Sequence, residues 1–151
     1  MKHSTTIRNY RESDFNSVIE LIRLNTPTYF SVEEEKDLAD YLKNSIEDYF
    51  VIELNHQVVG SGGINYSEDK KKGIISWDMI HPEYQGKSLG KMLLEYRITI
   101  LKEIKSIEKV SVRTSQLTYP FYEKSGFELI NIEKDYWAKD FDLYEMEYYL
   151  L

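Results

Sequence analysis

The stretch from Ile80 to Lys91 (Ile-His-Pro-Glu-Tyr-Gln-Gly-Lys-Ser-Leu-Gly-Lys) combines residue types that could bind an anion. An apolar, β-branched segment stops at Pro82, two glycines and a lysine follow, and a helical pattern begins at Leu89. The first turn of a helix leaves backbone N–H groups without intrahelical partners, and the helix dipole adds partial positive charge there. A glycine loop between a strand and such a helix is therefore typical of an anion site, and we expect a phosphate or pyrophosphate as its ligand.

Two common nucleotide-binding motifs do not fit this loop. Gly86-Lys87-Ser88 resembles the end of a Walker A loop, but that motif needs a glycine five residues before Gly86, where His81 stands. The dinucleotide fingerprint G-x-G-x-x-G cannot be drawn through Gly86 and Gly90. What remains is a Gln-x-x-Ser-x-Gly pattern after a strand, with Phe121-Tyr122-Glu123-Lys124-Ser125-Gly126-Phe127 further along the chain.

Together these two segments resemble the GNAT family of acyl-CoA-dependent N-acyltransferases. Gln85 to Gly90 matches the family's (Gln/Arg)-x-x-Gly-x-(Gly/Ala) pyrophosphate motif, and Phe121 to Phe127 matches its (Leu/Phe)-Tyr-x-x-x-Gly-(Phe/Tyr) signature. The order of expected elements also agrees from Thr5 to the C-terminus. The resemblance implies an N-acetyltransferase that uses acetyl-CoA as co-substrate and acetylates an amine of a small molecule or peptide.

The resemblance also implies which residues hold the coenzyme. Backbone amides of the loop would bind the CoA pyrophosphate, and the main chain before the loop would pair with the pantetheine arm like an added strand. The predicted CoA-binding residues are Asp78, Met79, Ile80, Gln85, Gly86, Lys87, Ser88, Leu89, Gly90, Lys91, Ser115 and Tyr122.

Two positions depart from the family's pattern. Ser88 stands where glycine is usual, so either its φ stays negative or the loop accepts some strain. Its N–H is retained and its hydroxyl could add a phosphate contact, so we expect binding to persist. Ser115 stands about where many members carry an asparagine that contacts the CoA arm, and we expect that contact to be shorter or lost.

Acyl transfer from a thioester to an amine needs a neutral amine and a proton for the departing thiolate. The family motif places Tyr122 where many members have their general acid, and a phenol with a pKa of about 10 suits a thiolate whose conjugate acid lies near about 8.5. Asp78 is the candidate base, directly or through water, although it could equally be a solvated or paired carboxylate. His81 suits a base by residue type but stands on the Pro82 turn. Tyr122 could also be a simple core aromatic.

The family usually places its acceptor between the first two helices, the central strands and the C-terminal hairpin. Here that region supplies the candidate acceptor-binding residues Tyr29, Phe30, Trp77 and Trp137, and Trp77 could alternatively belong to the core. With the carboxylates of Glu33 to Glu35, these aromatic rings would suit a cationic amine. An ordinary solvated acidic helix start explains the carboxylates at least as well.

Composition sets the wider limits. The 151 residues predict a single domain, 1–151, that is long enough to bury a core. A net charge of −7 argues against nucleic-acid binding, which needs a basic face. With no cysteine, no apolar stretch long enough to span a membrane and no signal peptide, we expect a cytoplasmic protein without a membrane partner. Three dispersed histidines make a metal site unexpected.

Hydrophobic periodicity gives the elements that would position these residues. The pattern predicts strands over 5–9, 49–54, 57–66, 73–80, 109–113, 127–132 and 143–150. Helices are predicted from Ser13 to about Asn25, from a Ser31–Glu34 capping box through Leu42, from Leu89 to Ile104, and over 117–125. The apolar face of the third helix is predicted to be Leu89, Leu93, Tyr96, Ile100 and Ile104. We therefore expect a mixed α/β (α+β) fold, with a mostly antiparallel sheet of about seven strands flanked by about four helices, as in GNAT proteins.

Two other functions compete with direct acetyl transfer in a ternary complex. A GNAT-like domain could bind acyl-CoA as a sensor or assembly module without turnover, and a nucleotide-binding protein could use the same loop for ATP. A homodimer is common in the family, and the tyrosine-rich C-terminus (Tyr144, Tyr148, Tyr149) could serve it.

Overall fold

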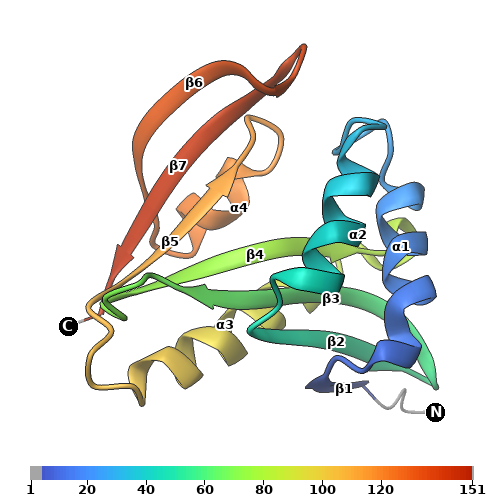
Figure 1. Ribbon diagram of the computed structural model, residues 1–151, viewed down its shortest axis with the longest axis horizontal. Helices are drawn as coiled ribbons and strands as arrows, with labels where there is room; N and C mark the ends of the chain where they lie inside the picture. The colour runs from blue at the N-terminus through green and yellow to red at the C-terminus, as the bar shows by residue number, and fades with distance from the viewer. Residues whose placement is uncertain (1–4, 151) are drawn as a thin grey trace.

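One sheet of seven strands organises residues 5–150, the part of the chain that the computed structural model describes (Figure 1). The strands are β1 (Thr5–Asn9), β2 (Asp48–Leu54), β3 (Gln57–Tyr66), β4 (Lys72–Ile80), β5 (Lys109–Thr114), β6 (Glu128–Ala138) and β7 (Phe141–Tyr149). The helices are η1 (Glu12–Asp14), α1 (Phe15–Leu24), α2 (Glu34–Asn44), η2 (Pro82–Tyr84), α3 (Leu89–Lys102) and α4 (Tyr119–Lys124). This mixed architecture confirms the predicted fold class.

The strand order β1-β2-β3-β4-β5-β7-β6 contains one feature that creates a site. Neighbouring strands are antiparallel except for β4 and β5, which run parallel. Their pairing joins Lys72–Ile75 to 109–112 and stops there. Beyond Ile75, β4 pairs only with β3, and Figure 1 shows β5 and the β6–β7 hairpin turning away from it. The sheet therefore opens into a fork whose two arms are the carboxyl ends of β4 and β5.

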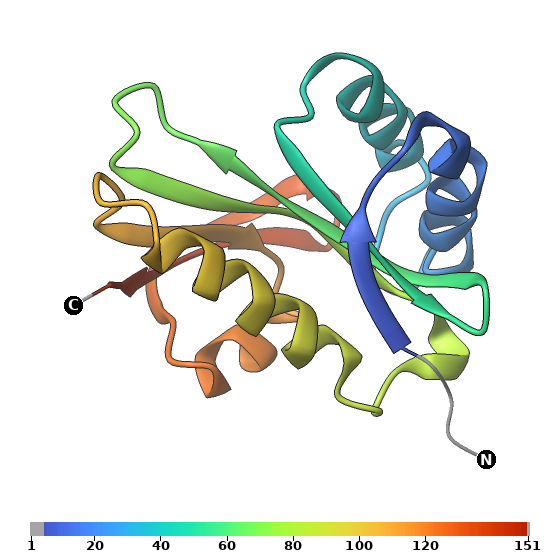
Figure 2. The same cartoon turned by 90° about the horizontal axis from the view of Figure 1, so that it is seen from below.

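The helices cover the two faces of the sheet in separate groups. In Figure 2, α1 and α2 lie on one face, and α3 and α4 lie on the other. Each group has its own core, one built on Leu21, Ile22 and Leu38, the other on Leu93, Leu101 and Phe127. None of the helices in residues 5–150 has the length and apolar character that crossing a membrane requires.

Local chemistry explains most element boundaries, including a tight turn at Asn55-His56. Both turn residues have positive φ, 50° and 66°, as a two-residue hairpin loop requires. The predicted capping box forms only in part: the Glu34 carboxylate accepts the Ser31 N–H at 2.8 Å, while the Ser31 hydroxyl has no partner within the described chain. Helix α2 therefore begins at Glu34 itself.

Two predictions about the elements were wrong in detail. The predicted apolar face of α3 included Tyr96, which is exposed, whereas the buried stripe runs through Leu93, Leu94, Arg97 and Leu101. Strand β6 extends to Ala138 rather than stopping at Ile132. It is the edge strand and is exposed along most of its length, so no alternation of buried and exposed residues marks it in the sequence.

Candidate active site

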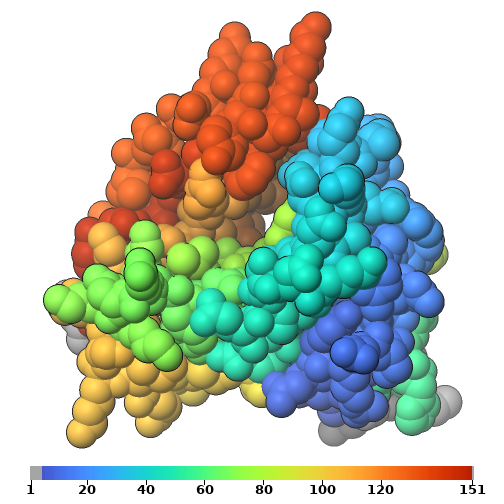
Figure 3. Space-filling model, in the orientation of Figure 1, coloured from blue at the N-terminus to red at the C-terminus, as the bar shows by residue number. Residues whose placement is uncertain are grey.

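The fork between β4 and β5 is a cleft of about 1490 Å³ that reaches both faces of the sheet. On one side it is lined by the α3 loop and α4, and on the other by the α1–α2 connection and the β6–β7 hairpin. Figure 3 shows the hollow between the β6–β7 hairpin and α2. A cleft open from both faces can admit two reactants that meet in the middle.

The loop before α3 has the geometry of an anion site. Gly86 and Ser88 both adopt left-handed backbone conformations, with φ of 77° and 64°. The first helical bond of α3 runs from the Met92 N–H to the Ser88 carbonyl. The six N–H groups from Gly86 to Lys91 donate no hydrogen bond to any other residue within 5–150. These donors are available to a phosphate group.

The sequence left two alternatives for Ser88, a negative φ or a strained loop. The positive φ of Ser88 shows that the loop accepts the strain. A left-handed conformation costs a non-glycine residue roughly 1–2 kcal/mol. The Ser88 hydroxyl forms no side-chain cap on α3. Its contribution to the loop is the backbone shape and a free N–H.

The Gln85 side chain forms hydrogen bonds within the protein. Its amide N–H₂ group donates to Asn25 Oδ1 and to the Ile80 carbonyl, both at 3.1 Å. The buried Asn25 also donates to the Ile80 carbonyl at 3.1 Å and to the Leu21 carbonyl at 2.8 Å. These bonds join the end of α1 to the end of β4 and fix the start of the loop.

Ile80 presents one backbone group to the open edge of β4. The His81 N–H bonds the Val59 carbonyl at 2.8 Å, so Ile80 and Gly60 form a non-hydrogen-bonded pair. The N–H and carbonyl of Ile80 therefore point away from β3. The two amide side chains occupy the carbonyl, which leaves the N–H as the donor that an extended amide ligand could meet.

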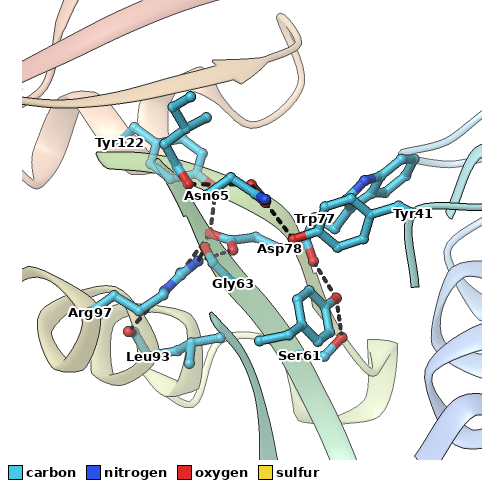
Figure 4. Close-up of polar contacts among 12 residues, drawn as sticks. Tyr41, Ser61, Gly63, Asn65, Trp77, Asp78, Leu93, Arg97 and Tyr122 are labelled. Carbon is cyan, nitrogen blue, oxygen red and sulfur yellow. Dashed lines mark hydrogen bonds and ion pairs between the residues drawn. The ribbon is translucent and has the colours of Figure 1, made fainter. Parts of the chain in front are cut away.

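Three side chains form a hydrogen-bonded chain at the cleft, with Tyr122 and Asp78 in its wall and Arg97 buried behind them (Figure 4). The Tyr122 hydroxyl donates to Asp78 Oδ2 at 2.6 Å. Arg97 donates a hydrogen bond to each carboxylate oxygen of Asp78, at 2.5 Å and 2.9 Å. Arg97 is fully buried and also donates to the Gly63 and Leu93 carbonyls. Burial raises the pKa of Tyr122 well above its usual range, and the neighbouring Asp78 charge raises it further.

A β-bulge and a glycine allow this arrangement. The register of β3 against β4 shifts between Ser61 and Gly63, and Trp77 opposite the shift has φ 51°. The bulge sends Trp77 to the α1–α2 face and Asp78 to the α3 face. A Cβ on Gly62 would lie 2.3 Å from Asp78 Oδ1 and 2.9 Å from Arg97 Nη1. Only glycine leaves room there for the ion pair.

The four predicted acceptor-binding aromatics all line the cleft. Trp77 packs against the α1–α2 core and stacks on Phe30, with 6.2 Å between the ring centroids, and its backbone carbonyl accepts a hydrogen bond from the Tyr49 hydroxyl at 3.0 Å. Trp137 is tied to the end of β5, because its indole N–H donates to the Thr114 carbonyl at 3.1 Å. Tyr29 completes the set from the α1–α2 connection.

Most of the predicted CoA-binding residues lie in the cleft wall. Every predicted CoA-binding residue except Lys87 lines the cleft; Lys87 extends over the Tyr84 ring, with 5.9 Å from Nζ to the ring centroid. The Ser115 hydroxyl accepts the Leu117 N–H at 3.2 Å and so serves the turn before α4. His81 does not line the cleft, and its Nδ1 accepts the Glu83 N–H at 3.1 Å.

Sequence reasoning missed Arg97 and the role of Gly62. A signal for Arg97 was present, because it lies four residues after Leu93 and four before Leu101, in the buried stripe of α3. An arginine in such a stripe requires a buried acidic partner. The residue that could supply it lies on another element, so the partner could not be read from the helix alone.

We expect Gly86→Ala to weaken CoA binding about tenfold, because alanine resists the left-handed φ of 77° although nothing lies within 4 Å of its Cβ. Calorimetric titration with CoA measures the effect. Gly126→Ala is the matched control, since Gly126 also has a positive φ of 101° but lies outside the cleft. It should lower the melting temperature without changing the CoA affinity. Equal affinities of Gly86→Ala and wild type would contradict the assignment of the loop.

The cleft wall also holds the buried carboxyl group of Glu34, and burial raises its pKa. A raised pKa means that the folded protein binds this proton more tightly than the unfolded chain. Stability from this group is therefore highest at low pH and falls as pH rises from the ordinary glutamate pKa to the raised one. Glu34→Gln should reduce that fall. Urea unfolding of both proteins between pH 4 and pH 8 measures it, and identical pH dependence would refute the prediction.

Known proteins resemble this chain in sequence and in fold. The profile of the Acetyltransferase (GNAT) family matches residues 15–127. An amino-acid acetyltransferase of Pasteurella multocida is 31% identical over 132 residues, which cover 87% of this chain but only 29% of that protein. The N-alpha-acetyltransferase of Sulfurisphaera tokodaii is 29% identical over 157 residues, covering 93% of this chain and 90% of that one.

The fold of this chain is shared with a solved N-acetyltransferase structure. The PaiA N-acetyltransferase of Thermoplasma acidophilum, solved in complex with coenzyme A, superposes with a TM-score of 0.76 at 19% identity, over 97% of this chain and 99% of that one. The family profile covers most of the chain, including both motifs in the cleft, and the structural superposition covers 97% of it. This chain therefore belongs to the GNAT family of acetyltransferases.

Proposed function

We propose that this N-acetyltransferase binds acetyl-CoA along the α3 side of the cleft and transfers the acetyl group directly to an amine that enters from the α1–α2 side. The observation that carries the proposal is the 2.6 Å hydrogen bond from Tyr122 to Asp78, in the same cleft as the unpaired N–H groups of the loop. It places a proton donor and an acceptor side by side where the two faces of the cleft meet.

Two proton transfers follow from this pair. As the amine nitrogen forms its bond to the acetyl carbonyl carbon, Asp78 takes the nitrogen's proton, directly or through water. When the C–S bond breaks, Tyr122 gives its proton to the departing thiolate. The proton on Asp78 then returns to the Tyr122 oxygen along their hydrogen bond. The net change is one proton moved from nitrogen to sulfur, and both side chains end as they began.

The surroundings support these roles. Because its pKa is raised, Tyr122 stays protonated in the resting enzyme, so its proton is present when the C–S bond breaks. Arg97 keeps Asp78 in one orientation through two hydrogen bonds. The 151 residues include no cysteine, and neither His56 nor His81, the histidines of residues 5–150, lines the cleft, so the described chain offers no thiol nucleophile and no histidine there to activate a serine. Transfer in a ternary complex is the simplest route.

The relatives' names give the range of acceptors. They include an amino-acid acetyltransferase and an N-alpha-acetyltransferase, so a free amino acid and a peptide N-terminus are the leading classes. The first name belongs to a protein of which this chain spans only 29%. A cytoplasmic location and a homodimer stay predictions from the sequence.

Ligand-induced thermal stabilisation tests the donor half of the proposal. CoA and acetyl-CoA should raise the melting temperature, whereas ATP should not, because the loop lacks the Walker A glycine. Stabilisation by ATP alone would contradict the proposal. Intact-mass measurement after mixing with acetyl-CoA in the absence of an acceptor tests direct transfer. A stable acetyl group on the protein that an added amine then removes would show a covalent route instead.

A further inference from the structure

Arg113 brings an unneutralised positive charge to the acceptor side of the cleft. It lies in β5, next to Val112, which packs in the α3-side core and is the last residue to pair with β4. Since successive side chains of a strand point to opposite faces, Arg113 lies on the Trp77 side of the sheet, at the base of the fork. Among the arginines of residues 5–150, it is the one that lines the cleft.

Aromatic side chains hold the Arg113 guanidinium in place. Its central carbon lies 4.9 Å from the Tyr136 ring centroid and 5.6 Å from that of Trp137. Its Nη2 donates to the Tyr136 hydroxyl at 2.6 Å. Trp137 is itself anchored to the Thr114 carbonyl. A guanidinium fixed in this way has lost much of the rotational freedom that a surface arginine keeps.

This guanidinium has no acidic partner in residues 5–150. No carboxylate oxygen of that range lies within 4.0 Å of it, whereas Arg8, Arg23 and Arg97 each form an ion pair. Its cross-strand neighbour Glu145 instead accepts the Asn131 amide at 2.9 Å. Of its five N–H donors, one is used within the described chain. The others form a planar fork suited to two carboxylate oxygens.

We infer that the acceptor carries a carboxylate near its reactive amine, as a free amino acid does, and that Arg113 binds this carboxylate. The inference rests on the proposed acetyltransferase function and narrows its acceptor. It selects among the acceptors that the sequence left open, and it disfavours a purely cationic amine, which the fixed guanidinium would repel. The stacked rings of Phe30 and Trp77 across the cleft would then face the acceptor's side chain.

The test compares free L-amino acids with the same amino acids as C-terminal amides, using acetyl-CoA and thiol release. Wild type should have a kcat/KM at least about tenfold higher for the acids. Arg113→Gln should raise KM for the acids about 10- to 100-fold, with kcat and the KM for acetyl-CoA little changed. Arg113→Lys, which keeps the charge without the fork, should fall between them.

The same substitution at Arg11, an exposed arginine outside the cleft, is the matched control and should leave all constants unchanged. Melting curves confirm that each variant is folded. Amides used as well as acids, an equal effect of Arg113→Gln on both, or turnover only of amines without a carboxylate would overturn the inference and leave the acetyltransferase function standing. No turnover with any amine would contradict the function itself.

Discussion

Tyr122→Phe is expected to lower kcat about 100- to 1000-fold while changing the CoA affinity less than about twofold. The phenol is the proposed proton donor to the thiolate, and its loss leaves the leaving group unprotonated in a buried site. Phenylalanine keeps the edge-to-face ring contacts with Phe121 and Phe127. Asp78 keeps both bonds from Arg97. Steady-state thiol release and CoA titration measure the two quantities separately.

Tyr66→Phe is the matched control for this variant. Tyr66 also donates to an aspartate, Asp48, at 2.6 Å, but neither residue lines the cleft. Its loss should leave kcat unchanged, so a general effect of removing a tyrosine–aspartate bond would be visible. A Tyr122→Phe enzyme with wild-type kcat would exclude Tyr122 as the acid and return it to the core-aromatic alternative.

Arg97→Met is expected to destabilise the protein by about 3–5 kcal/mol. Methionine fills part of the volume, but Asp78 then stays in the cleft wall without its only cationic partner within the described chain. Because domains of this kind have total stabilities of about 5–15 kcal/mol, the loss is a large share of the whole. Urea unfolding measures it. Activity should fall as well, since Asp78 loses the two bonds that orient it.

A second substitution distinguishes the effect of losing the ion pair from the effect of losing packed volume at Arg97. In the Arg97→Met, Asp78→Asn double variant no charge is left unpaired, so much of the lost stability should return. The coupling energy of this cycle measures the interaction across α3 and β4. Additive losses from the two changes would show that Arg97 acts by filling space and not by holding the carboxylate.

The loop and the fold could be predicted because they depend on neighbours in the sequence. Gly86, Pro82 and the leucines that begin at Leu89 define a strand, a turn and a helix start by local rules, and the motif around Tyr122 supplied the family resemblance. The order and type of the seven strands and of α1 to α4 followed from hydrophobic periodicity, whereas the short helices η1 and η2 were not predicted. Only elements with one buried face can be located in this way, which is why the exposed end of β6 was missed.

The polar centre of the site could not be predicted in the same way. Arg97 and Asp78 lie on different elements, and their contact depends on the bulge at Trp77 and on the missing side chain at Gly62. The position of Arg113 between two rings depends on the pairing of β5 with β7 and β6. Such contacts are set by sheet register, which no local pattern of residue types records.

Catalysis of acetyl transfer by the cleft is tested most directly by incubating the wild-type protein with acetyl-CoA and a panel of amino acids, peptides, polyamines and aminoglycosides. Thiol release and the N-acetylated product are then quantified by mass spectrometry. We predict that thiol release depends on the acceptor and is matched one to one by N-acetyl product. Tight binding of acetyl-CoA with no N-acetyl product from any amine would contradict the account and favour an acyl-CoA-binding module without turnover.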